Sequence, residues 1–290
     1  MTFSPNLVQD LSQMLAHDFM QRALVAGTGI ALAAGLTGYF VLLRNQVFTS
    51  DALGHVAFTG GLGALLAGLW LPAGVFGASI AVALGMGALG GRARGRDVAI
   101  GTVFAWVLGV GVLFLSLFTA SRSAAAGGTA GVSILFGSIL GLQPAQALAA
   151  TVASIATVAL LLAIARPLLF VSLDPEVAAA RGVPTTAVTA LFLVLLGAAV
   201  AEAVQAVGAL LILGLMVTPA AIALKLTARP YAGLLLSAGM ALAFLWLGLG
   251  LAFYLPYPAG FFIVAPAFAA YVAVEGVARA AVRAASRGRS

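Results

Sequence analysis

The sequence predicts an all-α polytopic membrane protein with about nine transmembrane helices. Two observations carry this prediction: 63% of the 290 residues are hydrophobic and only 8% are charged, and long apolar runs recur along the whole chain. A soluble domain has about a quarter charged residues, whereas each run here has about 20 residues, the length of helix that crosses a bilayer. The runs are continuous and do not alternate at every second residue, which does not fit a transmembrane β-barrel.

Short breaks that carry bases, prolines or other turn residues separate the nine predicted spans. Abundant small residues, including 35 Gly, fit close packing of helices in lipid, where small side chains let two backbones approach each other. Each boundary is expected to hold to within a few residues. In chain order, the predicted spans are residues 23–43, 48–69, 72–90, 98–119, 145–165, 186–203, 207–224, 232–254 and 259–277.

The basic residues give these spans an orientation. If the breaks are assigned to alternate sides, all but two of the 14 Lys and Arg residues fall on one side, the exceptions being Arg22 and Arg122. By the positive-inside rule this side is cytoplasmic, so we expect the N-terminus outside and the C-terminus inside. The net charge of +6 therefore does not point to nucleic acid, and the lack of Cys excludes disulfides and thiolate metal sites.

The two ends of the chain form segments of their own. In residues 1–21 apolar side chains recur at helical spacing with polar residues between them, which predicts an amphipathic helix in the membrane interface and not a signal peptide. His17 and Asp18 are adjacent, do not share a helix face, and are interpreted as interfacial residues. We expect residues 22–278 to form the transmembrane domain and residues 279–290 a basic cytoplasmic tail.

A polar segment at residues 166–184 contains its own short helix, which we expect at about residues 173–183. Asp174 can cap its N-terminus, Pro175 suits the first helical position and Gly182 supplies the stop. Two interpretations are open: an ordinary surface helix, or a coupling helix that fits a groove on a separate ATPase. The chain has no GxxxxGK[ST] motif and cannot hydrolyse ATP itself, so we predict a transport subunit and no enzyme. The residues assigned to coupling are Asp174, Pro175, Glu176, Val177, Ala178, Arg181 and Gly182.

Asp51 and His55 place an acid and a histidine inside the second predicted span. Ionisable groups are expensive in lipid and are usually functional there. At a spacing of four residues both lie on one helix face, and a carboxylate with a neutral imidazole suits a divalent first-row metal such as Zn²⁺ or Mn²⁺. A proton relay or a purely structural pair also fits the same two residues. Two such helices brought together would supply four donors.

Glu202 and Gln205 fall in the break between the sixth and seventh predicted spans, on the outer side of the membrane. They are spaced three residues apart and share a helix face. A solvated turn and an entrance or gate for an ion are both open. Arg122 falls in a predicted outer loop, and Pro219 predicts a kink within the seventh span.

Six stretches resemble, in order, those of the membrane permease subunit of zinc/manganese ABC importers. The stretch around Asp51 and His55 is similar to the family's acid-x-x-x-His segment, and the one around Asp174 to its "DPEFA" coupling loop. Gly54 replaces a usual Ser, Phe58 to Gly60 replace a usual "LPG", and Arg96 stands where the family often has an acid. The six are "SDALGHVAFTGG" at 50–61, "RDVAIGTVFA" at 96–105, "ILFGSIL" at 134–140, "FVSLDPEVAAARGVP" at 170–184, "AVGALLILGLMVTPAAIA" at 206–223 and "YPAGFFIV" at 257–264.

The resemblance implies a type II ABC importer-like permease fold in the cytoplasmic (inner) membrane of a prokaryote. It implies a permease homodimer, two cytoplasmic ATPase subunits and an extracytoplasmic metal-binding protein. Asp51 and His55 match the positions that bind the transported metal in the family, and residues 173–183 match the coupling helix. The histidine favours Zn²⁺ as the cargo, with Mn²⁺ next, because Mn²⁺ can use the same donors. No cofactor is expected. The rival hypotheses are a proton-coupled secondary metal carrier, which often shows inverted repeats, and an uptake permease for a metal chelate.

Overall fold

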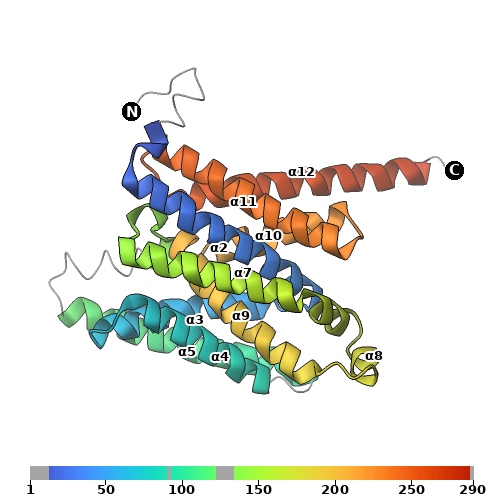
Figure 1. Cartoon of the computed structure of the whole chain (residues 1–290), viewed down its shortest axis with the longest axis horizontal. Coiled ribbons are helices and arrows are strands. Elements are labelled where there is room, and N and C mark those ends of the chain that lie inside the picture. The colour runs from blue at the N-terminus through green and yellow to red at the C-terminus, as the bar shows by residue number, and fades with distance from the viewer. Residues whose placement is uncertain (1–12, 90–92, 122–133, 288–290) are drawn as a thin grey trace.

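The computed structural model describes residues 13–89, 93–121 and 134–287, and every long element in these ranges is an α-helix (Figure 1). Nine of the helices are long and two elements are short: the six-residue α8 and the 3₁₀ turn η1. The elements are α2 (Asp18–Leu43), α3 (Val47–Leu66), α4 (Leu71–Leu89), α5 (Ala93–Ser121), η1 (Ile139–Gly141), α7 (Pro144–Leu173), α8 (Pro175–Ala180), α9 (Thr185–Val207), α10 (Ile212–Leu226), α11 (Pro230–Tyr254) and α12 (Ala259–Arg287).

Each of the nine predicted spans corresponds to one of these long helices. Within the described ranges, seven of them are long and apolar enough to cross a membrane. The two others are α10, which has 15 residues, and α3, whose polar residues and glycines lower its mean hydropathy. These two helices carry or adjoin the polar features described below.

Among the predicted boundaries, those at two polar segments were wrong. The polar segment was expected to leave the membrane at residue 166, but α7 continues through Pro167 to Leu173, so only residues 174–184 separate α7 from α9. The break expected at residues 201–205 lies inside α9, which ends at Val207. In both places the chain stays helical because tertiary contacts satisfy side chains that looked like loop residues. The expected N-terminal helix lies largely in residues 1–12, outside the described part of the chain.

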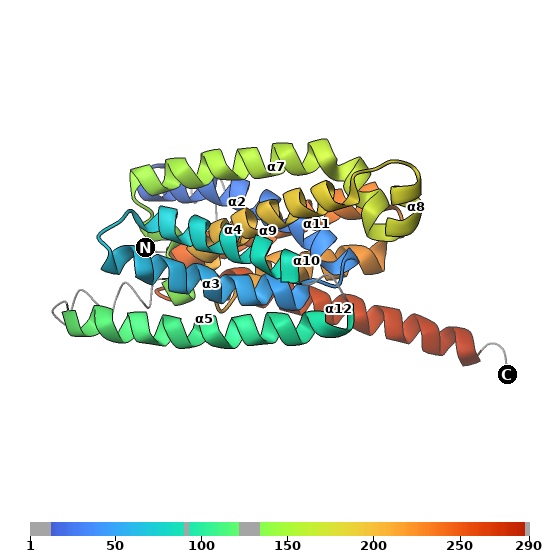
Figure 2. The ribbon, with the colours of Figure 1, turned by 90° about the horizontal axis from the view of Figure 1, so that it is seen from below.

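The bundle has two lateral groups of helices and a central group that lies between them (Figures 1 and 2). On one side α3 packs against α4 and α5, and on the other α10, α11 and α12 pack together. Helices α2, α7 and α9 lie between these groups, and α2 and α9 are the most buried of the candidate spans. In contrast, α5 and α12 lie at the periphery. Helix α3 therefore contacts α4 and α5 on one side and faces the centre of the bundle on the other.

Close backbone contacts hold α3 against its neighbour α4. A Cβ atom built on Gly60 would lie 2.5 Å from the carbonyl oxygen of Gly74, a separation that real Cβ atoms do not adopt. The two glycines therefore let the backbones of α3 and α4 meet, as small residues do at helix crossings in membranes. This crossing fixes the direction in which α3 runs beside α5.

Basic residues from several helices lie near one end of the bundle. Figure 1 shows α8 and the C-terminus at one end and the described N-terminal residues at the other. Arg44 lines a cavity with Pro175 at the α8 end. Near the same end Glu275 of α12 bonds to Lys225 of α10 and, at 2.8 Å, to Arg279. Bases from breaks far apart in sequence thus gather on the side that the positive-inside rule assigns to the cytoplasm.

Candidate functional site

Asp51 and His55 lie in the second and third turns of α3, on an accessible stripe of the helix. Between them Ala52, Leu53 and Gly54 are buried, whereas both ionisable residues are half-buried. Phe48, which is 43% exposed, continues the stripe by one turn. The spacing of three and four residues therefore brings the acid and the histidine to the same face, as the sequence predicts.

An aromatic side chain of α5 borders this stripe. The ring of Phe104 lies edge-to-face against His55, with the ring centroids 5.2 Å apart, and meets Phe48 in the same way at 5.9 Å. Aromatic pairs prefer this geometry. Phe104 therefore orients the imidazole and makes one wall of the site apolar.

The polar atoms of the pair are available to a ligand. Over the described residues, neither the Asp51 carboxylate nor the His55 ring nitrogens take part in a hydrogen bond or an ion pair. In these ranges, no group of three or more His, Cys, Asp or Glu residues could hold a metal ion. Since Zn²⁺ sites use four ligands, one chain supplies a carboxylate and an imidazole but not a full coordination shell.

The other side of α3 is fixed by contacts with the centre of the bundle. The Ser50 hydroxyl, next to Asp51, donates to the sulfur of Met216 at 3.1 Å in a buried contact with α10. A Cβ on Gly54 would lie 3.3 Å from the carbonyl oxygen of Ala209, so the residue that departs from the family pattern lets the α9–α10 junction approach. Thr59, in the "FTG" stretch, donates to the carbonyl of Val107 on α5 at 3.2 Å. These departures therefore lie at packing contacts of α3.

The short helix in the polar segment has the structure that its sequence predicts. Asp174 is the N-cap of α8, and its carboxylate accepts a hydrogen bond from the amide of Val177 at 2.9 Å. At the other end Gly182 has φ +79°, and the Val183 amide donates to the carbonyl of Ala178 at 3.1 Å. Ala178 is buried while Val177 is 43% exposed. A capped helix thus has an exposed outer face, and its coupling role stays a prediction.

Glu202 does not lie in a solvated turn. It belongs to α9 and is fully buried. The hydroxyls of two residues on α7 donate to its two carboxylate oxygens: Ser154 at 2.8 Å and Thr157 at 3.1 Å. Ser154 and Thr157 are three residues apart on an apolar helix, and this spacing was the sequence signal for a polar contact. That Glu202 accepts both hydrogen bonds could not be predicted from the sequence.

Gln205 lies one turn further along α9, beside a cavity of about 250 Å³ at the end of the bundle opposite α8. Ser138, Gln143 and Gln146 line the same cavity. The amide nitrogen of Gln205 donates to the carbonyl of Ala201 at 3.2 Å, so its oxygen remains for the cavity. The structure thus separates the two predicted gate residues: Gln205 borders this cavity, and Glu202 is enclosed by helices.

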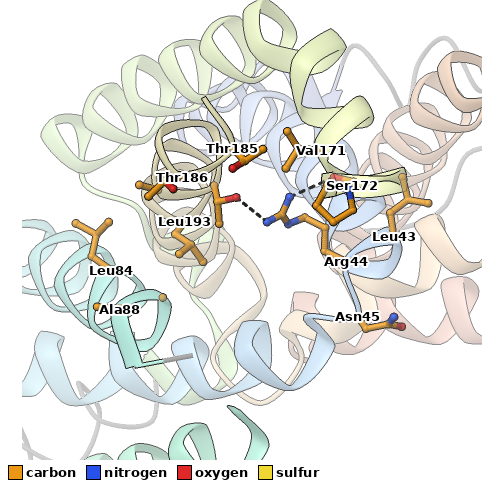
Figure 3. A pocket seen from close by; sticks show the side chains of 14 residues that line it. Leu43, Arg44, Asn45, Leu84, Ala88, Val171, Ser172, Thr185, Thr186 and Leu193 are labelled. Carbon is orange, nitrogen blue, oxygen red and sulfur yellow. Dashed lines mark hydrogen bonds between the residues drawn. The ribbon is translucent and has the colours of Figure 1, made fainter. Parts of the chain in front are cut away.

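A second cavity, of about 770 Å³, was not predicted. It lies at the α8 end between α2, α4, α7 and α9, and Figure 3 shows Arg44 reaching into it. The Arg44 guanidinium donates to Ser172 at 3.4 Å and to Thr189 at 3.0 Å. From the sequence, Arg44 was only one of the basic residues that indicate the cytoplasmic side.

Comparison with known proteins gives one family and several relatives. Residues 16–277 match the model of the ABC 3 transport family. The chain is 31% identical to the manganese import system permease protein ScaB of Streptococcus parasanguinis, over 85% of this chain and 86% of that protein. It is 30% identical to the chelated iron transport system membrane protein YfeC of Yersinia pestis, over 77% of this chain and 74% of that one. Among solved structures it is similar to a chain of PsaBC from Streptococcus pneumoniae in complex with Fab, with a TM-score of 0.79, 26% identity and coverage of 93% and 95%.

Proposed function

The chain belongs to the ABC 3 transport family, and from this membership we propose that it is the permease of an ATP-driven importer for a divalent transition metal. It is a multi-pass membrane protein and a transport component, not an enzyme. The proposed cargo is Zn²⁺, with Mn²⁺ next. The metal is a substrate that passes through, and the chain is expected to hold no resident cofactor.

One observation carries the proposal: Asp51 and His55 lie on the accessible stripe of α3, and their polar atoms make no hydrogen bond or ion pair with the described residues. Ionisable side chains in a membrane helix normally find partners or line a path. One carboxylate oxygen and one imidazole nitrogen suit Zn²⁺ or Mn²⁺, and a second copy of the chain would complete the shell with two more donors. The metal therefore passes between two protomers, close to the axis of a homodimer.

The choice of metal rests on ligand chemistry and on relatives. An imidazole donor favours Zn²⁺ over harder ions, whereas a carboxylate is also a good ligand for Mn²⁺. The relative ScaB is described as a manganese import permease and YfeC as part of a chelated iron system. Direct competition between Zn²⁺ and Mn²⁺ for uptake distinguishes these cargoes.

The two ends of the bundle suit different partners. At the α8 end the exposed face of the capped helix would meet the ATPase subunits, one on each protomer. The opposite end, where Gln205 borders its cavity, would receive the extracytoplasmic metal-binding protein. The distribution of bases supports placing the α8 end in the cytoplasm and the N-terminus outside, in a prokaryotic cytoplasmic membrane.

A proton-coupled carrier is the second candidate, because Glu202 is an acid buried inside a membrane helix, a common feature of proton relays. The capped helix α8 has no role in such a carrier. A permease for a metal chelate would need a wide path and has no need of the acid–histidine pair.

Uptake into vesicles that contain the complete complex tests the proposal. We expect Zn²⁺ or Mn²⁺ uptake that needs ATP and is lost in Asp51→Ala and in His55→Ala. His17→Ala and Asp18→Ala, which change the chain's other histidine and its neighbouring acid, are matched controls and should transport normally. Uptake driven by a pH gradient without ATP would favour the carrier, and unchanged uptake in both site variants would remove the site.

A further inference from the structure

We propose that Arg44 is a positioning residue that links the coupling helix α8 to the metal-site helix α3. The inference rests on the proposed function, because it concerns how movement at the ATPase side reaches Asp51 and His55. The end of α7 and the start of α9, which attach α8 to the bundle, are here called the two arms of α8.

Arg44 is joined rigidly to α3. It is the C-cap of α2, and its amide donates to the carbonyl of Phe40 at 2.9 Å. Asn45 follows with φ +51°, and the Gln46 amide donates back to the carbonyl of Val41 at 2.8 Å. Non-glycine residues adopt this left-handed conformation only in tight turns. Because α3 begins at Val47, a displacement of Arg44 is passed to the first turn of the metal-site helix.

The Arg44 side chain contacts both arms (Figure 3). One guanidinium nitrogen donates to the Ser172 hydroxyl at 3.4 Å, three residues before α8, and the other donates to Thr189 at 3.0 Å, in the second turn of α9. Ser172 gives its own proton to the carbonyl of Leu168 at 2.6 Å, so its oxygen is placed to accept. The guanidinium also lies 5.3 Å from the ring centre of Phe192, a cation–π contact with α9.

The cavity around Arg44 leaves room for the arms to move. Close-packed interiors resist displacement, but here about 770 Å³ lies between the arms, α2 and α4. A smaller chamber of about 90 Å³ adjoins it and is lined by Arg44, Thr189 and, from the start of α3, Gln46 and Thr49. The hydrogen bonds of Arg44 to Ser172 and Thr189 thus cross a space in which packing alone would not connect the arms to α3.

The packing of α8 makes such a link useful. Helix α8 packs mainly against α7 and α9, so a pull on α8 first displaces its arms. Arg44 bonds to both arms and is continuous with α3. It therefore converts a joint movement of Ser172 and Thr189 into a movement of the turn that precedes Asp51.

The test measures metal transported per ATP hydrolysed by the complete complex in vesicles, with Zn²⁺ and Mn²⁺ as probes. We expect this ratio to fall about tenfold in Arg44→Gln, the scale expected when hydrogen bonds from a charged donor are lost, while ATP hydrolysis and assembly persist. Arg44→Lys keeps the charge and should recover part of the ratio. The double variant Ser172→Ala/Thr189→Val keeps Arg44 but removes both acceptors, and it should reproduce the loss. Arg229→Gln, at an exposed base between α10 and α11, is the matched control and should behave as native.

A native ratio in Arg44→Gln or in the double variant overturns the inference. If Arg44→Gln does not assemble, the double variant decides by the same criterion. Hydrogen exchange of residues 44–51 supplies a readout that does not depend on the cargo. Trapping the ATPase with nucleotide should change exchange there in the native complex and not in either variant, and an equal change in all three overturns the link. Absence of ATP-driven metal uptake by the native complex counts against the proposed function, and the exchange measurement still decides on Arg44.

Discussion

The Ser154 hydroxyl on α7 lies 2.8 Å from a carboxylate oxygen of Glu202 on α9, and both residues are fully buried. Thr157, one turn further along α7, donates to the other oxygen of the same carboxyl group at 3.1 Å. A polar group inside lipid is tolerated when neighbouring helices satisfy it. The contact therefore fastens α7 to α9, the two helices that also form the arms of α8.

Substitution of Glu202 should separate a fastening role from a gate role. Glu202→Gln can still accept from Thr157 and can donate to the Ser154 oxygen, because Ser154 also lies 2.7 Å from the carbonyl of Ala150. We expect this variant to keep most of its stability and its uptake. Glu202→Ala removes both contacts and leaves a cavity, which should lower the free energy of unfolding by about 2–3 kcal/mol. Thermal unfolding in detergent measures the difference.

Exposed Glu176 provides the control, since Glu176→Gln should leave the stability of the bundle unchanged. If Glu202→Gln unfolds like native protein but no longer transports, the carboxyl acts on the ion, and the gate that the sequence predicts is the better interpretation.

The same residues explain which parts of the fold could be predicted. The nine long helices follow from apolar runs, since only a continuous helix satisfies its backbone in lipid. The end of α9 could not be placed because Glu202 and Gln205 look like loop residues until Ser154 and Thr157 are brought beside them. The extension of α7 past Pro167 was missed for a related reason, since Pro commonly ends helices in water.

In the candidate site, too, relations within one helix could be predicted from the sequence, and contacts between distant helices could not. Asp51 and His55 lie on one helix, and their relation follows from spacing alone. The caps of α8 are also local, and Asp174 and Gly182 act as the sequence predicts. Arg44 meets Ser172 and Thr189 across 128 and 145 residues. Such contacts depend on how helices are arranged, and helical periodicity contains no information about that.

The crossing of α3 and α4 should be sensitive to a single methyl group. A Cβ on Gly74 would run into the backbone carbonyl of Gly60, whereas a Cβ on Gly77 of the same helix meets nothing within 4 Å. We expect Gly74→Ala to lower the free energy of unfolding by about 1–3 kcal/mol through overpacking. Gly77→Ala should be neutral or slightly stabilising, since Ala favours helix over Gly. Equal melting midpoints for the two variants would contradict the close crossing.

The N-cap of α8 should control its attachment to the ATPase. Asp174→Ala removes the acceptor for the Val177 amide and should destabilise this short helix by about 1 kcal/mol. Asp174→Asn keeps a capping oxygen and should be nearly native. The amount of ATPase that purifies with each variant is the measurement. If Asp174→Ala and Asp174→Asn are equally impaired, the charge of Asp174 matters and not its cap.

Dimers with unequal protomers test whether one ion uses both copies of the site. We expect a mixed dimer of one native protomer and one Asp51→Ala/His55→Ala protomer, isolated through a different affinity tag on each protomer, to retain only two of the four proposed donors. Since a structural or transport site for Zn²⁺ needs close to four ligands, metal uptake should fall nearly to the level of the double-variant dimer. Two independent paths, one through each protomer, predict instead that half of the native uptake remains. A native–native dimer isolated through the same two tags is the control, and ATP hydrolysis normalises the amount of active complex. Retention of half the uptake would move the path from the dimer axis into each chain, and Asp51 and His55 would then need further ligands from within the same protomer.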